Sequence, residues 1–143
     1  MGIFRGIHED VWESLLETVI AAGLETIEIT MNTEHAASLI RRAVKISHSR
    51  LMIGAGTVCS RESLDAALDA GATFIVSPVL IEGIVSYCTK QGIAVFPGAL
   101  TPQEIHNAWQ AGATMVKVFP AKVFGPPYFK EVKAPFGDIQ LLA

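Results

Sequence analysis

Short apolar runs alternate with amphipathic stretches along most of the chain. The runs are rich in β-branched residues and predict buried strands. They cover Thr26–Thr30, Leu51–Ala55, Thr73–Ser77, Ile93–Pro97 and Thr114–Phe119, with two more strands expected from Gly2 and over Asp138–Leu142. Between them lie stretches of helical length. The stretch Asp10–Ala22 is expected to bury a stripe made by Val11, Leu15, Val19 and Ala22. A second helix, Ser60–Ala70, is expected to bury Leu64, Ala67 and Leu68.

A glycine followed by a short apolar run marks the end of four predicted helices. Glycines 23, 71, 92 and 112 each precede a predicted strand, and the later ones recur about every 20 residues. A helix commonly ends on a left-handed residue, which glycine adopts freely. Strands alternating with helices imply parallel strands joined by right-handed crossovers. The regular period favours an α/β fold of the (β/α)8 TIM-barrel type, with an open doubly wound sheet as the alternative.

The count of strands falls short of a complete barrel. About seven strands are predicted in 143 residues, whereas such a barrel has eight strands and typically 200 residues or more. We therefore expect a single barrel domain over residues 1–143 that is truncated after about strand 7 and belongs to a longer protein. An open parallel edge would otherwise be exposed.

Composition narrows the class of protein. The chain is 50% apolar and 17% charged with a net charge of −3, so no basic surface for nucleic acid or an anionic membrane is expected. No stretch is long and apolar enough to be expected to span a bilayer, and the amino terminus has no signal-peptide core. Two cysteines, Cys59 and Cys88, form no disulfide framework, which predicts structural thiols in a reducing cytoplasm.

Lys117 is the candidate with the most chemical content. It lies in an apolar run, where burial favours the neutral amine and so a nucleophile able to form a Schiff base. Alternatively, it reaches water or pairs with a carboxylate. Side chains alternate along a strand, so Lys117 is expected to point into the barrel while Val116 and Val118 meet the helices. The same argument turns Glu28 inward, where the two could be catalytic or a buried salt bridge.

Further candidates follow the carboxyl ends of the strands, where active sites of such barrels lie. Thr57 could cap the next helix or bind a carboxylate, and the glycines of Gly54-Ala55-Gly56 could serve turn geometry. A dinucleotide loop is weakly supported, because a third glycine would be needed where Cys59 stands. Arg5 could contact an anion or pair with Glu9. The four histidines, His8, His35, His48 and His106, lack metal-ligand spacing and are expected at the solvated surface.

Several short sequence motifs, in the order in which they occur along the chain, resemble those of the KDPG aldolase family, which includes 4-hydroxy-2-oxoglutarate and phosphogalactonate aldolases. They are Phe4-Arg5-Gly6, Ile27-Glu28-Ile29-Thr30, Gly54-Ala55-Gly56-Thr57-Val58, Ser77-Pro78, Pro97-Gly98, Lys117-Val118-Phe119-Pro120-Ala121, Gly125-Pro126 and Tyr128-Phe129-Lys130. The resemblance implies a class I aldolase that needs no cofactor or metal, because a lysine forms the Schiff base with the substrate. It implies cleavage of a 2-keto-3-deoxy (6-phospho) sugar acid to pyruvate and an aldehyde such as glyceraldehyde 3-phosphate, in a homotrimer.

The resemblance also assigns roles to residues. Lys117 matches the Schiff-base lysine, Glu28 the general acid/base, and Thr57 a residue that holds the pyruvate carboxylate. The substrate pocket is implied to include Arg5, Asn32, Gly56, Ser77, Pro78 and Phe119. Asn32 stands where the phosphogluconate branch usually has an arginine and looks more like the phosphogalactonate branch, whereas Thr30 looks like the phosphogluconate one. The family's glycine-rich phosphate loop follows the seventh strand and is not in this sequence.

Two other readings remain open from the residues. One is a barrel isomerase or decarboxylase that acts on a sugar phosphate, with Lys117 as an electrostatic catalyst and no covalent step. The other is a truncated or degenerate barrel that serves as a non-catalytic binding or assembly module.

Overall fold

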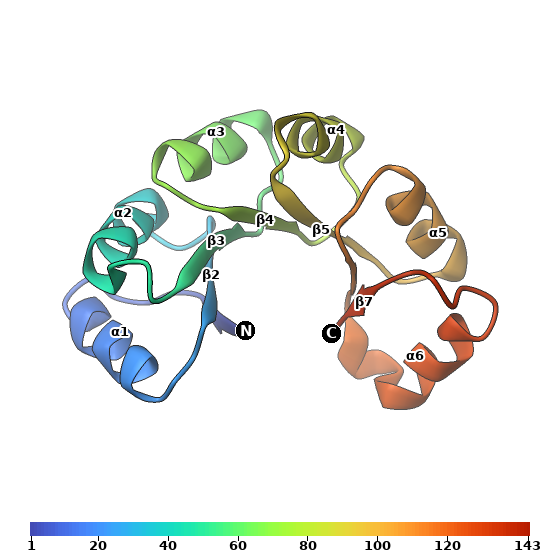
Figure 1. Ribbon diagram of the computed structural model, residues 1–143, viewed down its shortest axis with the longest axis horizontal. Coiled ribbons are helices and arrows are strands. Elements are labelled where there is room, and N and C mark those ends of the chain that lie inside the picture. The colour runs from blue at the N-terminus through green and yellow to red at the C-terminus, as the bar shows by residue number, and fades with distance from the viewer. The chain divides into compact units, whose positions relative to one another are not determined.

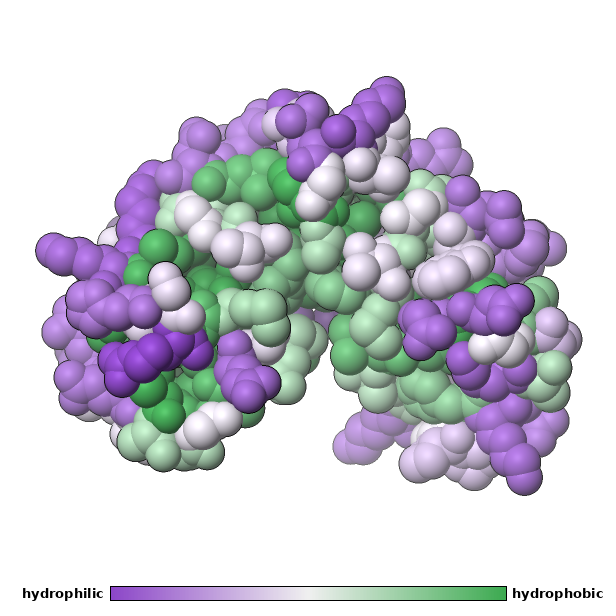
Figure 2. All heavy atoms as spheres, viewed as in Figure 1, coloured by the Kyte–Doolittle hydropathy of each residue, from purple (hydrophilic) through white to green (hydrophobic).

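A computed structural model describes all residues, 1–143. The chain divides into two compact units, Met1–Val76 and Ser77–Ala143, which are described separately. In each unit, strands alternate with helices, and the helices cover one face of the strands (Figure 1). Hydrophilic residues gather over the helices on the outside of each unit (Figure 2). The prediction of one domain over residues 1–143 is not tested by this division and stays a prediction.

The first unit contains four parallel strands in sequence order. They are β1 (Gly2–Phe4), β2 (Thr26–Thr30), β3 (Met52–Gly56) and β4 (Phe74–Ser77), the last of which ends one residue into the second unit. The helices between them are α1 (Trp12–Ala21), α2 (Ala36–Ser47) and α3 (Arg61–Asp69). The register pairs Glu28 with Ile3 of β1 on one side and with Gly54 of β3 on the other. Sequential order contradicts the doubly wound alternative, in which the strand order reverses at a switch point.

The second unit continues the same alternation. Its strands are β5 (Ala94–Ala99), β6 (Val116–Val118) and β7 (Leu141–Leu142), again parallel and in order. Its helices are α4 (Glu82–Gln91), α5 (Pro102–Gln110) and α6 (Gly125–Lys133), with a short 3₁₀ turn over Ala121–Val123. Seven parallel strands in sequence order, alternating with helices, are the strand–helix units of a (β/α) barrel. The predicted fold class is confirmed.

Local signals define several element boundaries. Glycines 23, 71, 92 and 112 all have positive φ and follow helices, as predicted. Ser60 and Thr101 are N-caps, and each completes a reciprocal capping box, with Ser63 and Glu104 respectively. The cap of α3 is therefore Ser60, so the alternative that Thr57 caps this helix is wrong.

The buried face of α1 differs from the prediction. Trp12 and Leu16 are buried, whereas Val11 and Ala22 are exposed and Leu15 and Val19 are half-buried. Trp12 turns inward because its ring adds a large apolar area and its indole N–H finds the buried carbonyl of Leu39, 3.1 Å away. The helix is thus rotated by about one position from the expected stripe. In α3, Leu64 and Ala67 are buried and Leu68 is half-buried, as expected.

Alternation along the strands separates the core from the opposite face. In the second unit, Val116 and Val118 belong to a buried cluster with residues of α5 and α6, such as Ile105, Ala108 and Val132. Lys117 lies between the two valines, so its side chain leaves the sheet on the other face. In the first unit, Ile27 and Ile29 are fully buried on either side of Glu28. The predicted orientations of Val116, Lys117 and Val118 relative to the helices are confirmed.

Candidate active site

Glu28 is held in a space that glycine leaves open. The side chain is 0% exposed, and a Cβ built on Gly56 would lie 1.7 Å from its Oε1 atom and 2.6 Å from its Cγ atom. A Cβ on Gly54 would meet the ring of Phe74 at 2.2 Å. Both glycines lie within β3 and neither has positive φ. The interpretation of these glycines as turn residues is therefore wrong: they are small so that Glu28 and Phe74 can cross the strand.

Thr57 has an unusual backbone. Directly after β3 it adopts φ +54°, the left-handed region that β-branched residues rarely enter. Its side chain is half-buried, and the N–H of Val58 that follows donates to the carbonyl of Val76 at 3.1 Å. Strain of this kind persists only where neighbouring contacts enforce it and is concentrated at functional sites. This observation supports a role for Thr57 in binding.

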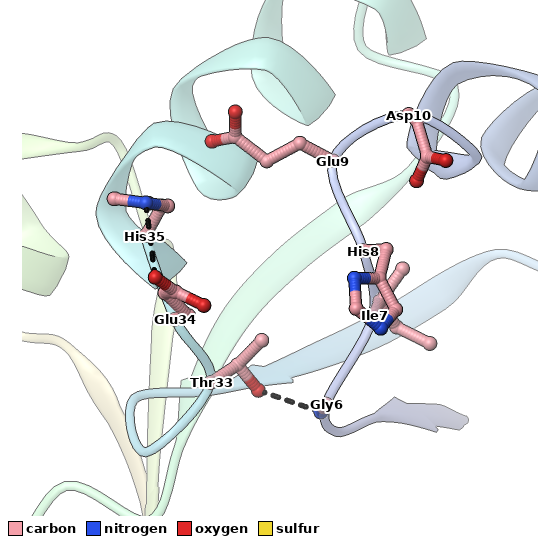
Figure 3. A pocket seen from close by; sticks show the side chains of 8 residues that line it. All are labelled: Gly6, Ile7, His8, Glu9, Asp10, Thr33, Glu34 and His35. Atoms are coloured by element: carbon pink, nitrogen blue, oxygen red, sulfur yellow. Dashed lines mark hydrogen bonds and ion pairs between the residues drawn. The ribbon is translucent and has the colours of Figure 1, made fainter.

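Arg5 and Asn32 are both exposed, on the loops that follow β1 and β2. The two loops meet at Thr33, whose hydroxyl accepts a hydrogen bond from the N–H of Gly6 at 3.0 Å (Figure 3). Gly6 and Thr33 line a cavity of about 370 Å³ together with His8, Glu9 and His35, whereas Arg5 and Asn32 are not part of its lining. No role for Thr33 was predicted from the sequence. Two threonines three residues apart at the end of a strand, Thr30 and Thr33, are the signal that could have found it.

Lys117 occupies the middle of β6 and is half-buried. Its Nζ atom lies 5.6 Å from the ring centroid of Phe119, within the range of a cation–π contact. Phe119 is 43% exposed, and its N–H donates to the carbonyl of Ala99 at 2.9 Å. Phe119 therefore lies beside the amine while part of the residue remains exposed.

Gly98 brings a third candidate segment close to Lys117. It is the register partner of Lys117 in β5, and a Cβ on it would lie only 2.1 Å from the carbonyl oxygen of Pro78. Glycine is required there so that the backbone after β4 can reach β5. Ser77 is fully buried, and its hydroxyl donates to the carbonyl of Val79 at 2.8 Å. This bond holds the backbone of the loop that follows β4.

A cavity of about 320 Å³ opens beside these residues in the second unit. Its lining includes Val79, Gly98, Leu100, Asn107 and Phe119. Glu104 stands at its edge and accepts hydrogen bonds from the N–H groups of Leu100 and Thr101, at 2.9 Å and 2.8 Å. These backbone bonds, that of Thr101 first, lower the pKa of Glu104. Burial raises the pKa of Tyr128, whose hydroxyl donates to the carbonyl of Leu100.

The histidines and the two cysteines are the remaining titratable candidates. Of the histidines, His8, His35 and His48 are exposed, whereas His106 is half-buried with its ring 5.6 Å from that of Phe136. No group of three or more histidine, cysteine or acidic side chains is arranged to hold a metal ion. Cys59 is exposed and Cys88 buried, and both are free thiols. Burial raises the pKa of Cys88, as expected for a structural thiol.

None of the helices combines the length and the apolar character that crossing a bilayer requires.

Parallel strand–helix units with a lysine on one strand and a buried glutamate on another define a (β/α)-barrel protein with candidate acid–base and nucleophilic groups. The family model of "KDPG and KHG aldolase" matches residues 5–143. The chain belongs to the KDPG and KHG aldolase family.

Named relatives lie on both substrate branches of this family. The chain is 35% identical over 134 residues to 2-dehydro-3-deoxy-6-phosphogalactonate aldolase of Escherichia coli K12, covering 94% of this chain and 65% of that protein. It is 35% identical over 127 residues to 2-dehydro-3-deoxy-phosphogluconate aldolase of Pseudomonas aeruginosa PAO1, covering 88% of this chain and 57% of that protein. The chain thus spans about two thirds or less of the length of these two relatives. Both are aldolases, which are lyases.

Solved structures share the fold. A native KDPGal structure has a TM-score of 0.92 at 35% identity, over 99% of this chain and 69% of that one. A KDPG aldolase from Legionella pneumophila, 24% identical with a TM-score of 0.87 over 97% of this chain and 66% of that one, holds pyruvate captured at low pH as a covalent carbinolamine intermediate. At that identity the likeness shows the fold alone.

Proposed function

We propose that the protein is a class I aldolase that reversibly cleaves a 2-keto-3-deoxy (6-phospho) sugar acid to pyruvate and an aldehyde such as glyceraldehyde 3-phosphate. The observation that carries this proposal is the position of Lys117 in a chain of the aldolase family. Its side chain leaves β6 on the face opposite the helix-packed valines, beside Phe119, which is partly exposed. A flat, apolar surface next to an amine suits a small keto acid.

The proposed chemistry begins with the amine of Lys117. After losing a proton, the amine attacks the C2 carbonyl of the substrate to give a carbinolamine, which loses water to give a protonated imine. The C3–C4 bond then breaks. Its electron pair moves toward the iminium nitrogen to form an enamine, while the C4 hydroxyl loses its proton and C4 becomes the aldehyde carbon. Protonation of the enamine at C3 and addition of water release pyruvate and restore the lysine.

Glu28 is proposed to carry the protons in these steps. It is a fully buried carboxylate, and a carboxylate held away from bulk water is suited to take a proton from a hydroxyl and return it to carbon. Thr57, Arg5 and Asn32 are proposed to bind the carboxylate of the keto acid, and Gly56, Ser77, Pro78 and Phe119 to shape the pocket. The strained backbone of Thr57 supports its part in this assignment.

Trapping with borohydride tests the covalent step. Protein incubated with pyruvate and sodium borohydride is expected to carry a reduced pyruvate adduct on Lys117, mapped by peptide mass spectrometry. Lys117→Arg should abolish the adduct, because a guanidinium group is not a nucleophile at neutral pH. Lys122→Arg is the matched control, since Lys122 is an exposed lysine five residues away. Absence of the adduct from wild-type protein would overturn the proposal and leave a non-covalent barrel enzyme or a binding module.

Two candidate substrates, 2-keto-3-deoxy-6-phosphogluconate and 2-keto-3-deoxy-6-phosphogalactonate, differ only in their configuration at C4. The relatives include a phosphogalactonate and a phosphogluconate aldolase at the same identity, and Asn32 and Thr30 resemble different branches. We propose to compare kcat/KM for the two 2-keto-3-deoxy-6-phosphoaldonates. Turnover of neither, with pyruvate still trapped on Lys117, would point to a shorter keto acid such as 4-hydroxy-2-oxoglutarate.

A homotrimer in the cytoplasm completes the proposal. Several large apolar side chains are exposed in the second unit, among them Val79, Val123 and Phe124, and a subunit contact would remove such groups from water. Free thiols fit a reducing compartment. Light scattering coupled to size exclusion is expected to give three times the subunit mass, and a monomer mass would refute the trimer.

A further inference from the structure

Two threonines join the loops that carry Arg5 and Asn32. Thr33 lies just beyond β2, where its N–H donates to the carbonyl of Thr30 at 2.9 Å and closes a tight turn. Both side chains are buried, Thr30 fully and Thr33 with 6% of its surface exposed. Their hydroxyl oxygens lie 3.0 Å apart. Figure 3 shows the Thr33 hydroxyl directed at the main chain of Gly6.

The direction of each hydrogen bond in this group is fixed by its ends. The N–H of Gly6 can only donate, so the Thr33 oxygen accepts from it at 3.0 Å. The carbonyl of Phe4 can only accept, so the Thr30 hydroxyl donates to it at 3.4 Å. Each hydroxyl has one proton, and that of Thr30 is already used. The Thr33 hydroxyl must therefore donate to the Thr30 oxygen.

The result is a continuous relay from Gly6 N–H through Thr33 and Thr30 to the Phe4 carbonyl. It begins at the amide that follows Arg5 and ends at the carbonyl that precedes it. Hydrogen bonds thus hold the main chain on both sides of Arg5, at the Phe4 carbonyl and the Gly6 N–H. Gly6 turns the chain at this point with φ +64°. The same two threonines flank Met31 and Asn32 in sequence. One pair of hydroxyls therefore fixes the position of Arg5 relative to Asn32.

We propose that Thr30 and Thr33 are positioning residues that set the guanidinium of Arg5 for recognition of the substrate carboxylate. This inference rests on the proposed aldolase function. It also accounts for Asn32, which stands where the phosphogluconate branch usually has an arginine for the carboxylate. The hydrogen bonds of Thr30 and Thr33 hold the main chain at Arg5 to the loop that carries Asn32, so that Arg5 can take this role. The hydroxyls themselves are buried and bonded to each other and to the main chain on either side of Arg5, so their proposed effect passes through Arg5.

Valine has nearly the shape of threonine but no hydroxyl, so this substitution separates the effect of the lost hydrogen bonds from the effect of lost side-chain volume. Thr33→Val removes both bonds of the Thr33 hydroxyl and keeps the shape, whereas Thr33→Ser keeps the hydroxyl. Thr30→Val breaks the same relay at its other member, so the test does not depend on the folding of one variant. Thr114→Val is the control, because the Thr114 hydroxyl also accepts from a distant N–H, that of Val95 at 3.0 Å. This bond lies at the amino-terminal ends of β5 and β6, whereas Thr33 lies beyond the carboxyl end of β2.

The readout is the pyruvate concentration that gives half-maximal borohydride trapping on Lys117, measured with the rate at saturating pyruvate. Thr33→Val and Thr30→Val are expected to raise that concentration about tenfold, the size of effect that the loss of one bond to a charged ligand produces. The saturating rate should change by less than about twofold, because binding and not chemistry is affected. Thr33→Ser and Thr114→Val should behave as the wild type.

A double variant decides whether the effect passes through Arg5. In the Arg5→Ala background, Thr33→Val should add no further shift, because residues that act as a unit are not additive. An equal shift in that background would show a general structural effect and overturn the inference. Unchanged binding by both valine variants, with normal trapping of wild-type protein, would overturn it while leaving the aldolase proposal intact. Absence of trapping in wild-type protein would overturn both.

Discussion

The Glu28 side chain occupies the space in which a Cβ on Gly56 would have to lie, 1.7 Å from the carboxylate oxygen Oε1. The overlap extends down the side chain, with Cδ at 2.4 Å and Cγ at 2.6 Å. Glu28 is completely buried, so it has no open space into which to retreat. The position of the proposed acid–base group therefore depends on the absence of a side chain two strand residues beyond its register partner, Gly54.

Gly56→Ala is expected to lower the free energy of unfolding by about 1–3 kcal/mol, because it forces an extra methyl group into packed space. It should also slow pyruvate trapping by displacing Glu28. Chemical denaturation and the trapping rate measure the two effects. Glu28→Asp in the same background should recover part of the stability, since the shorter side chain withdraws from the methyl group.

Gly83→Ala provides the control for this substitution. Gly83 lies in α4, and a Cβ there would meet nothing within 4 Å. Alanine should stabilise the helix by about 0.5–1 kcal/mol and leave trapping unchanged. Equal behaviour of the two alanine variants would contradict the packing argument for Gly56.

Thr57→Gly is expected to stabilise the protein while weakening pyruvate binding. A β-branched residue at φ +54° stores about 1–3 kcal/mol of strain, which exceeds the entropic cost of glycine of about 0.5–1 kcal/mol. The melting temperature should rise, and the pyruvate concentration for half-maximal trapping should rise with it. Ser49→Gly, at φ +65° on the exposed end of α2, should affect stability alone. A lower melting temperature for Thr57→Gly would contradict the strain argument.

The contribution of Glu104 to stability is expected to disappear in acid. Its pKa in the folded protein is lowered from the ordinary 4.5 by the backbone N–H groups that it accepts from. A lowered folded pKa means that the ionised form is stabilised by folding, so the contribution is complete above the unfolded pKa and is lost as the pH falls through the folded one. The difference in melting temperature between wild type and Glu104→Ala should be constant from pH 6 to about pH 5 and shrink below about pH 4.5. A difference that stays the same down to strongly acidic pH would contradict this explanation.

Trp12→Phe is expected to lower the free energy of unfolding by about 2–4 kcal/mol. The change removes the indole N–H that satisfies the buried Leu39 carbonyl at 3.1 Å and leaves a void in the core. Trp109→Phe, at a half-buried position, should cost less. Urea denaturation followed by circular dichroism compares the two, and a larger loss for Trp109→Phe would contradict the assignment of Trp12 to the core.

The strands were the most predictable part of the fold. The run Thr26–Thr30 coincides with β2 residue for residue, because alternation and β-branched composition agree there with a buried central strand. The same alternation correctly turned Lys117 away from the valines of β6. In α1 the pattern failed, because the large apolar residues form one broad arc that also contains Trp12, Leu16 and Ile20. Burial of the Trp12 ring, with its indole N–H bonded to the Leu39 carbonyl, turns the Trp12 side of this arc toward the core.

The parts of the site that depend on long-range contacts could not be predicted. Nothing local shows that Gly56 faces Glu28, or that Gly98 faces the carbonyl of Pro78, because each pair is separated by about 20 residues or more and meets only after the strands pair. The hydroxyl of Thr33 is the same kind of case, since its partner Gly6 lies 27 residues away. A sequence pattern identifies small or polar residues but not what fills the space beside them.

The capping box at the start of α3 determines where this scaffold tolerates redesign. Ser60 and Ser63 anchor the first turn of the helix, and Thr57 stands only three positions before it, so an insertion between strand and helix there would pull one of the two out of place. The connection after β1 is longer, and the first turn of α1 has no side-chain cap at Val11. Engineering of a new aldehyde specificity should therefore lengthen the loop after β1 beyond Gly6, where the bond to Thr33 ends, and leave the one after β3 untouched.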